Sequence, residues 1–185
     1  MSVNELSPGT SRLRLERIKA EDAAEYYKAG FEIADPEVAY YTGGGGTYDF
    51  ATIEAYLKRI AEAEDRYDFF IRLDDGEAIG EIVLKDVDPD AGRASMRIAL
   101  FSATRCGQGY GTEALRLLLD FAFGELGLHR VELEVYSYNE RARRSYLKCG
   151  FKEEGRLREA VIADGRRYDL VLMGILRAEY EAGRA

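Results

Sequence analysis

The chain has 185 residues, of which 46% are hydrophobic and 32% are charged, and it contains no tryptophan. That length and composition are typical of one globular unit, so we expect a single domain over residues 1–185, with residues 1–11 as a flexible N-terminus. The formal charge of -8, from 26 basic and 34 acidic side chains, disfavours a general nucleic-acid-binding surface.

The sequence carries no signal for a membrane or secretory location. No apolar stretch approaches the roughly 20 residues that a membrane span needs, and residues 1–11 lack a basic-then-apolar leader pattern. The two cysteines, Cys106 and Cys149, are far apart and have no histidine nearby, which argues against zinc and against a disulfide framework. We therefore expect a cytoplasmic protein with two free thiols and no membrane partner.

The first part of the chain is expected to hold one strand and two helices. Residues 13–18 alternate apolar and charged side chains as a half-buried strand does, and residues 21–31 have a helical composition. Asp35-Pro36 breaks that pattern, and the four glycines at 43–46 indicate a mobile loop. A second helix is expected from about residue 52 to 65. A lid over a substrate site is the alternative role of the glycine run.

The rest of the chain reads as strands interrupted by two helices. Turn residues at 74–76 and 88–92 separate three consecutive strands, which predicts an antiparallel meander. The expected elements are strands at 67–73, 77–87 and 93–101, a helix over 114–123, a strand at 130–136, a short helix ending at 149, and strands at 151–162 and 168–176. The order is β-α-α-β-β-β-α-β-α-β-β. It predicts an α/β (α+β) fold with a mixed, mainly antiparallel sheet of about seven strands flanked by about four helices.

A glycine-rich turn precedes the third helix. Three alternate glycines lead directly into its apolar run, and glycine allows the backbone N–H groups of such a turn to approach an anion at a helix N-terminus. The dinucleotide pattern fails because Thr112 stands where its third glycine belongs, and the P-loop lysine is absent. A glycine-rich helix entry without a ligand remains the alternative. The turn consists of Cys106, Gly107, Gln108, Gly109, Tyr110, Gly111, Thr112 and Glu113.

A second group of polar residues follows the strand at 130–136. Asn139 is a good N-cap for the next helix, and Ser137 with Glu140 would form a capping box if the helix began earlier. Tyr146 lies on the apolar face of that helix, where a core position and a proton donor are both consistent with the pattern. A basic stripe on the neighbouring face, either a phosphate contact or a solvated surface, consists of Arg141, Arg144 and Lys148.

These two groups together resemble a known family. Residues 105–114, followed by Asn139, Ala142, Tyr146 and residues 148–151 (Lys-Cys-Gly-Phe), are similar to the acetyl-CoA-binding core of the GNAT superfamily of N-acetyltransferases. The order of strands and helices resembles that fold over nearly the whole chain. Within the superfamily, the chain looks most similar to the branch of ribosomal-protein-alanine and spermidine acetyltransferases.

The resemblance implies a role for each matching residue. The amides of residues 107–112 would hold the pyrophosphate of CoA, and the strand ending at Leu100-Phe101 would separate from the strand at 131–135 so that pantetheine adds along it. Cys106 stands where the family usually has Arg or Gln, which we expect to alter affinity and not to abolish binding. The implied cofactor-binding residues are Leu100, Phe101, Cys106, Gly107, Gln108, Gly109, Tyr110, Gly111, Thr112, Asn139, Arg141 and Arg144.

The implied reaction is direct acetyl transfer from acetyl-CoA to a primary amine, with no metal. A backbone N–H near Leu100 or Phe101 would stabilise the oxyanion, and Tyr146 would act as general acid toward the thiolate. An aliphatic amine with a pKa of about 10 must first lose a proton. Glu81 and Glu134 are candidates for the base because they lie on central strands, although an exposed surface charge is the simpler interpretation of each.

Several alternatives remain at this point. A catalytically silent CoA-binding sensor or adaptor domain would also keep the fold, and Cys106 together with the unidentified base favours it. The acceptor is expected to be an amine-bearing small molecule or a protein N-terminus, with polyamines, amino acids and aminoglycosides among the candidates. A homodimer is left open.

Overall fold

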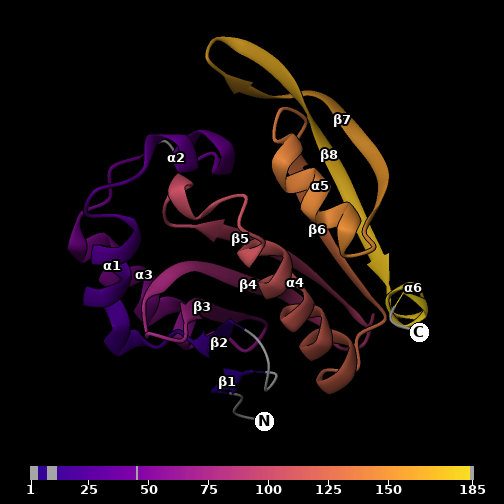
Figure 1. Cartoon of the computed structure of the whole chain (residues 1–185), viewed down its shortest axis with the longest axis horizontal. Helices are drawn as coiled ribbons and strands as arrows, with labels where there is room; N and C mark the ends of the chain where they lie inside the picture. The colour runs from indigo at the N-terminus through magenta and orange to yellow at the C-terminus, as the bar shows by residue number, and fades with distance from the viewer. Residues whose placement is uncertain (1–3, 8–11, 45, 184–185) are drawn as a thin grey trace.

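The computed structural model describes residues 4–7, 12–44 and 46–183. One eight-stranded sheet with the order β1-β2-β3-β4-β5-β6-β8-β7 runs through these residues (Figure 1). Neighbouring strands are antiparallel, except that β5 and β6 are parallel. The strands are β1 (Glu5–Leu6), β2 (Leu13–Arg17), β3 (Tyr67–Leu73), β4 (Ala78–Asp88), β5 (Arg93–Leu100), β6 (Arg130–Tyr136), β7 (Lys152–Ala163) and β8 (Arg166–Leu176).

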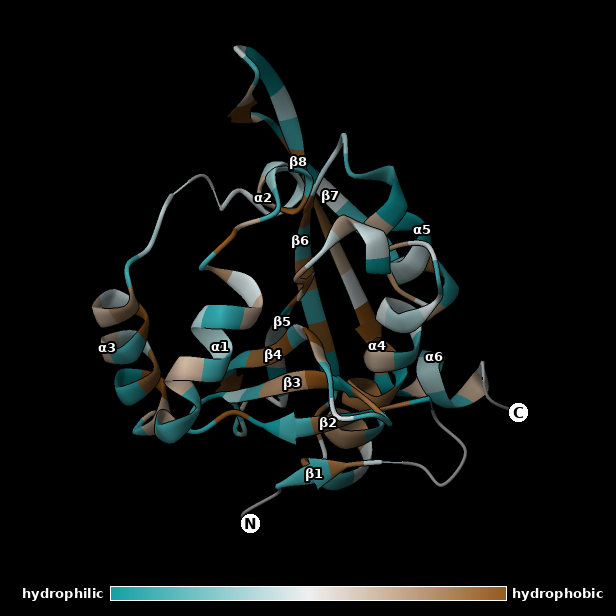
Figure 2. Ribbon diagram, turned by 60° about the vertical axis from the view of Figure 1, so that its left-hand side comes forward, coloured by the Kyte–Doolittle hydropathy of each residue, from teal (hydrophilic) through white to brown (hydrophobic). Residues whose placement is uncertain are grey.

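Helices cover both faces of the sheet. On one face α4 packs against β2, β4 and β5 and contacts α5, whereas α1 and α3 pack on each other and α1 contacts β4 on the opposite face (Figure 2). A short π-helical turn, Phe121–Glu125, continues α4. The helices are α1 (Ala23–Gly30), α2 (Pro36–Thr42), α3 (Phe50–Ala61), α4 (Tyr110–Asp120), α5 (Glu140–Lys148) and α6 (Arg177–Ala182).

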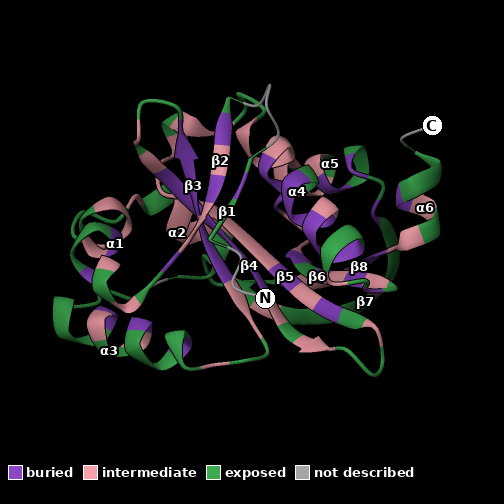
Figure 3. Cartoon of the chain, turned by 90° about the horizontal axis from the view of Figure 1, so that it is seen from below, coloured by how far each residue is buried: buried purple, intermediate pink, exposed green. Residues whose placement is uncertain are grey.

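The apolar pattern of the sequence explains this arrangement. On α3, Ile53, Leu57 and Ile60 recur at helical spacing and are all buried. On β3 consecutive side chains point to opposite faces, so that Phe69 joins the larger core under α4 while Phe70 joins the smaller core under α1 and α3. Figure 3 shows buried residues concentrated on the central strands. The central strands are therefore buried on both faces.

The fold class is as expected from the sequence, with three elements that the pattern did not reveal. Glu5–Leu6 pairs with β2 and adds an eighth strand, so the expectation of a flexible 1–11 segment is wrong for these two residues. Residues 1–3 and 8–11 lie outside the described residues. The terminal helix α6 and the short helix α2 were also not predicted.

The helix α2 begins where a break was expected. The carboxylate of Asp35 accepts hydrogen bonds from the backbone N–H groups of Glu37 (2.9 Å) and Val38 (3.3 Å), and Pro36 occupies the first turn. An N-cap followed by proline starts a helix. The first helical residue has no intrahelical partner for its N–H, so the missing N–H of proline costs no hydrogen bond there. Gly43, with φ of 73°, ends α2. The expected glycine loop at 43–46 follows, with residue 45 outside the described residues.

Two further expectations concern the whole chain. Cys106 and Cys149 are free thiols, as predicted. Among the helices that the structure describes, none is both long and apolar enough to span a bilayer.

Candidate active site

The parallel strands β5 and β6 separate soon after they begin. They pair over three positions only, where Arg93, Ala94 and Ser95 face Arg130, Val131 and Glu132. Beyond this point β5 remains paired with β4, and β6 remains paired with β8. The predicted separation of these two strands is therefore present, and it leaves one edge of each without a neighbouring strand.

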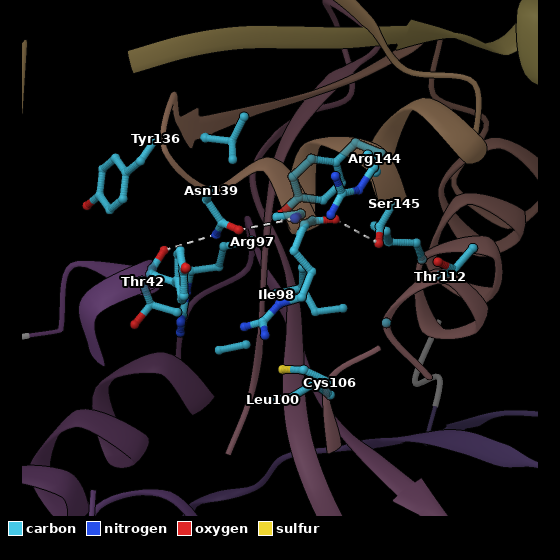
Figure 4. A pocket seen from close by; sticks show the side chains of 18 of the residues that line it. Thr42, Arg97, Ile98, Leu100, Cys106, Thr112, Tyr136, Asn139, Arg144 and Ser145 are labelled. Carbon is cyan, nitrogen blue, oxygen red and sulfur yellow. Dashed lines mark hydrogen bonds between the residues drawn. The ribbon is translucent and has the colours of Figure 1, made fainter. Parts of the chain in front are cut away.

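A cavity of about 560 Å³ occupies this gap, between β5 and β6 and bounded by α2, α4 and α5. In Figure 4, Thr42 and Tyr136 lie toward one end of it, and Thr112 and Ser145 lie toward the other. The cavity brings together most of the residues expected from the sequence. Those that line it are Leu100, Cys106, Gly107, Gly109, Gly111, Thr112, Asn139, Arg141, Arg144 and Tyr146, whereas Phe101, Gln108 and Tyr110 do not.

The glycine turn has the backbone conformation that the sequence predicted. Gly107 and Gly109 have φ values of 77° and 91°, in the left-handed region that other residues rarely adopt. Gly109 is also the N-cap of α4 and offers no side chain to the first helical N–H groups. These N–H groups lack partners within the helix, so the turn presents free donors and the positive end of the helix dipole.

Two side chains of the turn face away from the cavity. The guanidinium of Arg12 donates to the backbone oxygen of Gln108 (3.3 Å) and to Glu113 (2.9 Å), and it lies 4.8 Å from the ring centre of Tyr110. The side-chain amide of Gln108 donates to the backbone oxygen of Thr104 (2.7 Å). Gln108 and Tyr110 can therefore contribute main-chain groups only. Arg12 holds the outer side of the turn.

Leu100 and Phe101 were the two residues expected to supply the oxyanion N–H, and the hydrogen bonds of β5 exclude Phe101. The N–H of Phe101 donates to the backbone oxygen of Ile79 (2.9 Å), and its ring packs on Tyr26, so the expectation for Phe101 is wrong. In an antiparallel ladder, backbone groups alternate between the two edges of a strand. The N–H of Leu100, and that of Ile98 two residues earlier, therefore face the gap.

Tyr146 is buried on α5 and lines the cavity. Within the described part of the chain, nothing hydrogen-bonds its hydroxyl. Burial raises the pKa of this hydroxyl far above its usual value of 10.0. Tyr146 is thus a neutral proton donor at any pH at which the protein would be assayed.

Asn139 is the N-cap of α5, as predicted. Its side-chain oxygen accepts from the N–H of Ala142 (3.1 Å), and its side-chain nitrogen donates to the backbone oxygen of Tyr41 on α2 (3.2 Å). The helix begins at Glu140, so the alternative capping box is not formed. Asn139, which lines the cavity, thus connects α2 to α5 by hydrogen bonds.

Three of the four basic side chains of α5 line the cavity, namely Arg141, Arg144 and Lys148. Arg141 donates to Glu37 (3.0 Å) and stacks 5.1 Å above the ring centre of Tyr41, which again connects α5 to α2. Arg144 is exposed and lies 3.6 Å from Glu140.

The side chain of Cys106 also lines the cavity. Burial raises the pKa of its thiol, so the thiol is uncharged at neutral pH.

The two candidate carboxylates have opposite environments. Glu81 is 4% exposed and accepts from the hydroxyl of Tyr26 (2.6 Å) and from Arg97, so the expectation of an exposed surface charge is wrong for it. Glu134 is exposed, as expected, but it lines the cavity. Within the described residues no ion pair or hydrogen bond engages its carboxylate.

Helix α2 and Arg97 also contribute to the cavity, although neither a helix at α2 nor a role for Arg97 was predicted. Val38, Tyr41 and Thr42 form part of the cavity wall, and Arg97 projects into it from β5. The Asp35-Pro36 pair was the signal that could have revealed α2. No local signal distinguishes Arg97 from an ordinary charge on a strand.

Comparisons with known proteins agree with this geometry. Residues 12–152 match the family described as the acetyltransferase (GNAT) domain. Spermidine N(1)-acetyltransferase of Vibrio cholerae is 31% identical over 127 residues, which cover 69% of this chain and 72% of the relative. An uncharacterised N-acetyltransferase of Bacillus licheniformis is 28% identical over 179 residues, covering 92% and 96%.

A crystal structure of spermidine N-acetyltransferase from Vibrio cholerae in complex with CoA and spermine superposes with a TM-score of 0.81 at 24% identity. It covers 93% of this chain and 99% of that one. The match supports the fold class predicted from the sequence. The chain belongs to the GNAT family of acetyltransferases, which transfer an acetyl group from acetyl-CoA to an amine.

Proposed function

We propose that the cavity between β5 and β6 binds acetyl-CoA and catalyses acetyl transfer to a primary amine. The observation that carries the proposal is the convergence, in one cavity, of the glycine turn at 107–112, the edge of β5 that faces the gap and the side chain of Tyr146. The pyrophosphate would accept hydrogen bonds from the turn, and pantetheine would add to the edge of β5 as an extended ligand adds to a sheet. Bound acetyl-CoA supplies the acetyl thioester.

The chain's own residues would then move the protons. Glu134 would accept the proton of the incoming ammonium, since it lines the cavity and none of the residues that the structure describes pairs with its carboxylate. Glu81 is unsuited to this role because Arg97 and Tyr26 already occupy it. As the N–C bond forms and the C–S bond breaks, the N–H of Leu100 would stabilise the carbonyl oxygen and Tyr146 would protonate the sulfur. The second proton lost from nitrogen would return to Tyr146.

The basic residues would bind the nucleotide end. Arg141 and Arg144 line the cavity near the turn and can meet phosphates, with Arg144 the more available because it is exposed. Three relatives are named for spermidine acetylation, which makes a polyamine one candidate acceptor beside a protein N-terminus. The presence of both Tyr146 and Glu134 in the cavity favours catalysis over a silent CoA-binding domain.

Thiol release from acetyl-CoA tests the proposal. Purified protein is expected to release free thiol with at least one acceptor from a panel of peptides, polyamines, amino acids and aminoglycosides. Glu134→Gln is expected to lower kcat/KM by about 100-fold or more, because general-base catalysis contributes that much. CoA binding by calorimetry without turnover for any acceptor would support the silent domain instead.

A further inference from the structure

Arg97 and Glu134 face each other across the gap. Ser95 of β5 is in register with Glu132 of β6, and residues in register on parallel strands point their side chains to the same face of the sheet. Two residues further along each strand, the same face carries Arg97 and Glu134. Both side chains line the cavity, so it contains a cation on one wall and an anion on the other.

Of these two side chains, Arg97 has protein partners, on the side of the sheet toward β4 and α3. The guanidinium of Arg97 is ion-paired with Glu81 on β4 and donates to the hydroxyl of Tyr56 (3.1 Å). Glu81 is fixed in turn by the hydroxyl of Tyr26 (2.6 Å). A guanidinium carries five N–H donors, and these two contacts leave others for the cavity. Arg97 is therefore a rigid hydrogen-bond donor at the base of the gap.

This arrangement is complementary to a molecule with two different groups. Glu134 attracts an ammonium, and Arg97 offers N–H donors to an oxygen. An α-amino group has such an oxygen in its neighbouring carbonyl or carboxylate. A polyamine has no oxygen, and an ammonium, which only donates hydrogen bonds, cannot accept one from the guanidinium.

We propose that the acceptor is an α-amino group beside a carbonyl or carboxylate, with Arg97 donating to that oxygen and Glu134 taking the amine proton. This inference rests on the proposed function and specifies its substrate class. Glu134 takes one proton from the ammonium and releases it to solvent, and the neutral amine attacks. The N–C bond forms and the C–S bond breaks, the proton of Tyr146 goes to the leaving sulfur, and the second proton lost from nitrogen returns to Tyr146. Arg97 is the specificity-determining residue in this proposal.

Matched acceptors test the inference. Alaninamide and 2-aminobutane differ in the carbonyl group, and spermidine, free alanine and a short peptide with N-terminal alanine complete the set. Rates must be expressed per neutral amine, because an α-amino group has a pKa of about 8 and an alkylamine one of about 10. The expected kcat/KM for alaninamide exceeds that for 2-aminobutane and for spermidine by about 100-fold or more. The peptide and free alanine then distinguish a carbonyl from a carboxylate.

Substitutions of Arg97 test whether this residue causes the preference for alaninamide over 2-aminobutane. The double variant Arg97→Gln with Glu81→Gln removes both charges of the buried pair, so it avoids leaving one of them unpaired. It is expected to reduce the ratio between alaninamide and 2-aminobutane to within about threefold, at an unchanged KM for acetyl-CoA. Arg93→Gln removes the same charge from the paired end of β5, outside the cavity lining, and is expected to keep the ratio.

The outcomes separate the two proposals. Equal or faster acetylation of spermidine per neutral amine would overturn the inference while leaving acetyl transfer intact, whereas no transfer to any acceptor would overturn the proposed function. If the double variant unfolds below the assay temperature, Arg97→Lys keeps a positive charge beside Glu81 but lacks the guanidinium fork. The same loss of the ratio is then expected, and a retained ratio would contradict the role of Arg97.

Discussion

Replacing Tyr146 with phenylalanine removes one hydroxyl from the cavity and tests its role as general acid. Positioned proton donors contribute about 100- to 10,000-fold to a rate. The leaving group here is a thiol, and a model thiol has a pKa of about 8.5, so the thiolate departs with less help than an alkoxide needs. We therefore expect the lower end of that range, a loss of about 100-fold in kcat.

The same substitution is expected to leave folding and binding unchanged. No described residue hydrogen-bonds the hydroxyl of Tyr146, so its removal leaves no protein group unsatisfied, and stability should change by less than about 0.5 kcal/mol. The KM for acetyl-CoA should also be preserved. Since burial raises the pKa of Tyr146, the wild-type enzyme should show no loss of rate from this group as the pH rises to about 10.

Thiol release at saturating acetyl-CoA measures the effect, with thermal unfolding as the check on folding. Tyr136→Phe is the matched control, because Tyr136 lines the same cavity on β6. It should lose less than about threefold in kcat. A Tyr146→Phe enzyme that keeps its rate within the same limit would refute the assignment of Tyr146 as general acid.

Three further substitutions test the parts that shape the cavity. Gly109→Ala strains the left-handed conformation by about 1–2 kcal/mol. If the free turn relieves that strain by changing conformation, CoA must restore it on binding, and the Kd for CoA measured by calorimetry should rise by about 5- to 30-fold. Gly43→Ala places a Cβ against the hydroxyl of Tyr136 at a positive φ and should destabilise the protein by more than about 1 kcal/mol in urea unfolding. Asp35→Asn should lower the melting temperature at pH 7. The melting temperature of this variant should also fall less steeply than that of the wild type as the pH is lowered. Hydrogen bonds, chiefly from the N–H of Ala103, lower the pKa of Asp35 below 3.8, so its stabilisation is complete above that pH and is lost as the pH falls through the native value.

Local sequence patterns predicted most of the fold. The helical spacing of Ile53, Leu57 and Ile60 depends on neighbours within a few turns, and so does the capping of α5 by Asn139. The glycine turn was recognisable for the same reason, because the left-handed conformation of Gly109 is a property of one residue and its immediate neighbours.

The features that the sequence did not reveal depend on contacts between distant segments. Glu81 is buried because Tyr26, 55 positions away, and Arg97 satisfy its carboxylate, and no local pattern records that pairing. The exclusion of Phe101 from the cavity likewise depends on its hydrogen bond to Ile79 of β4. The wall formed by α2 is held by contacts such as that between Tyr41 and Asn139, which joins segments 98 positions apart.

Amide hydrogen exchange followed by NMR, with and without CoA, tests the central claim most directly. If the main chain of the glycine turn binds the diphosphate and the open edge of β5 binds pantetheine, CoA should slow exchange at residues 107–112 and at the amides of Ile98 and Leu100. Protection of other surfaces, with these amides unchanged at saturating CoA, would contradict the account.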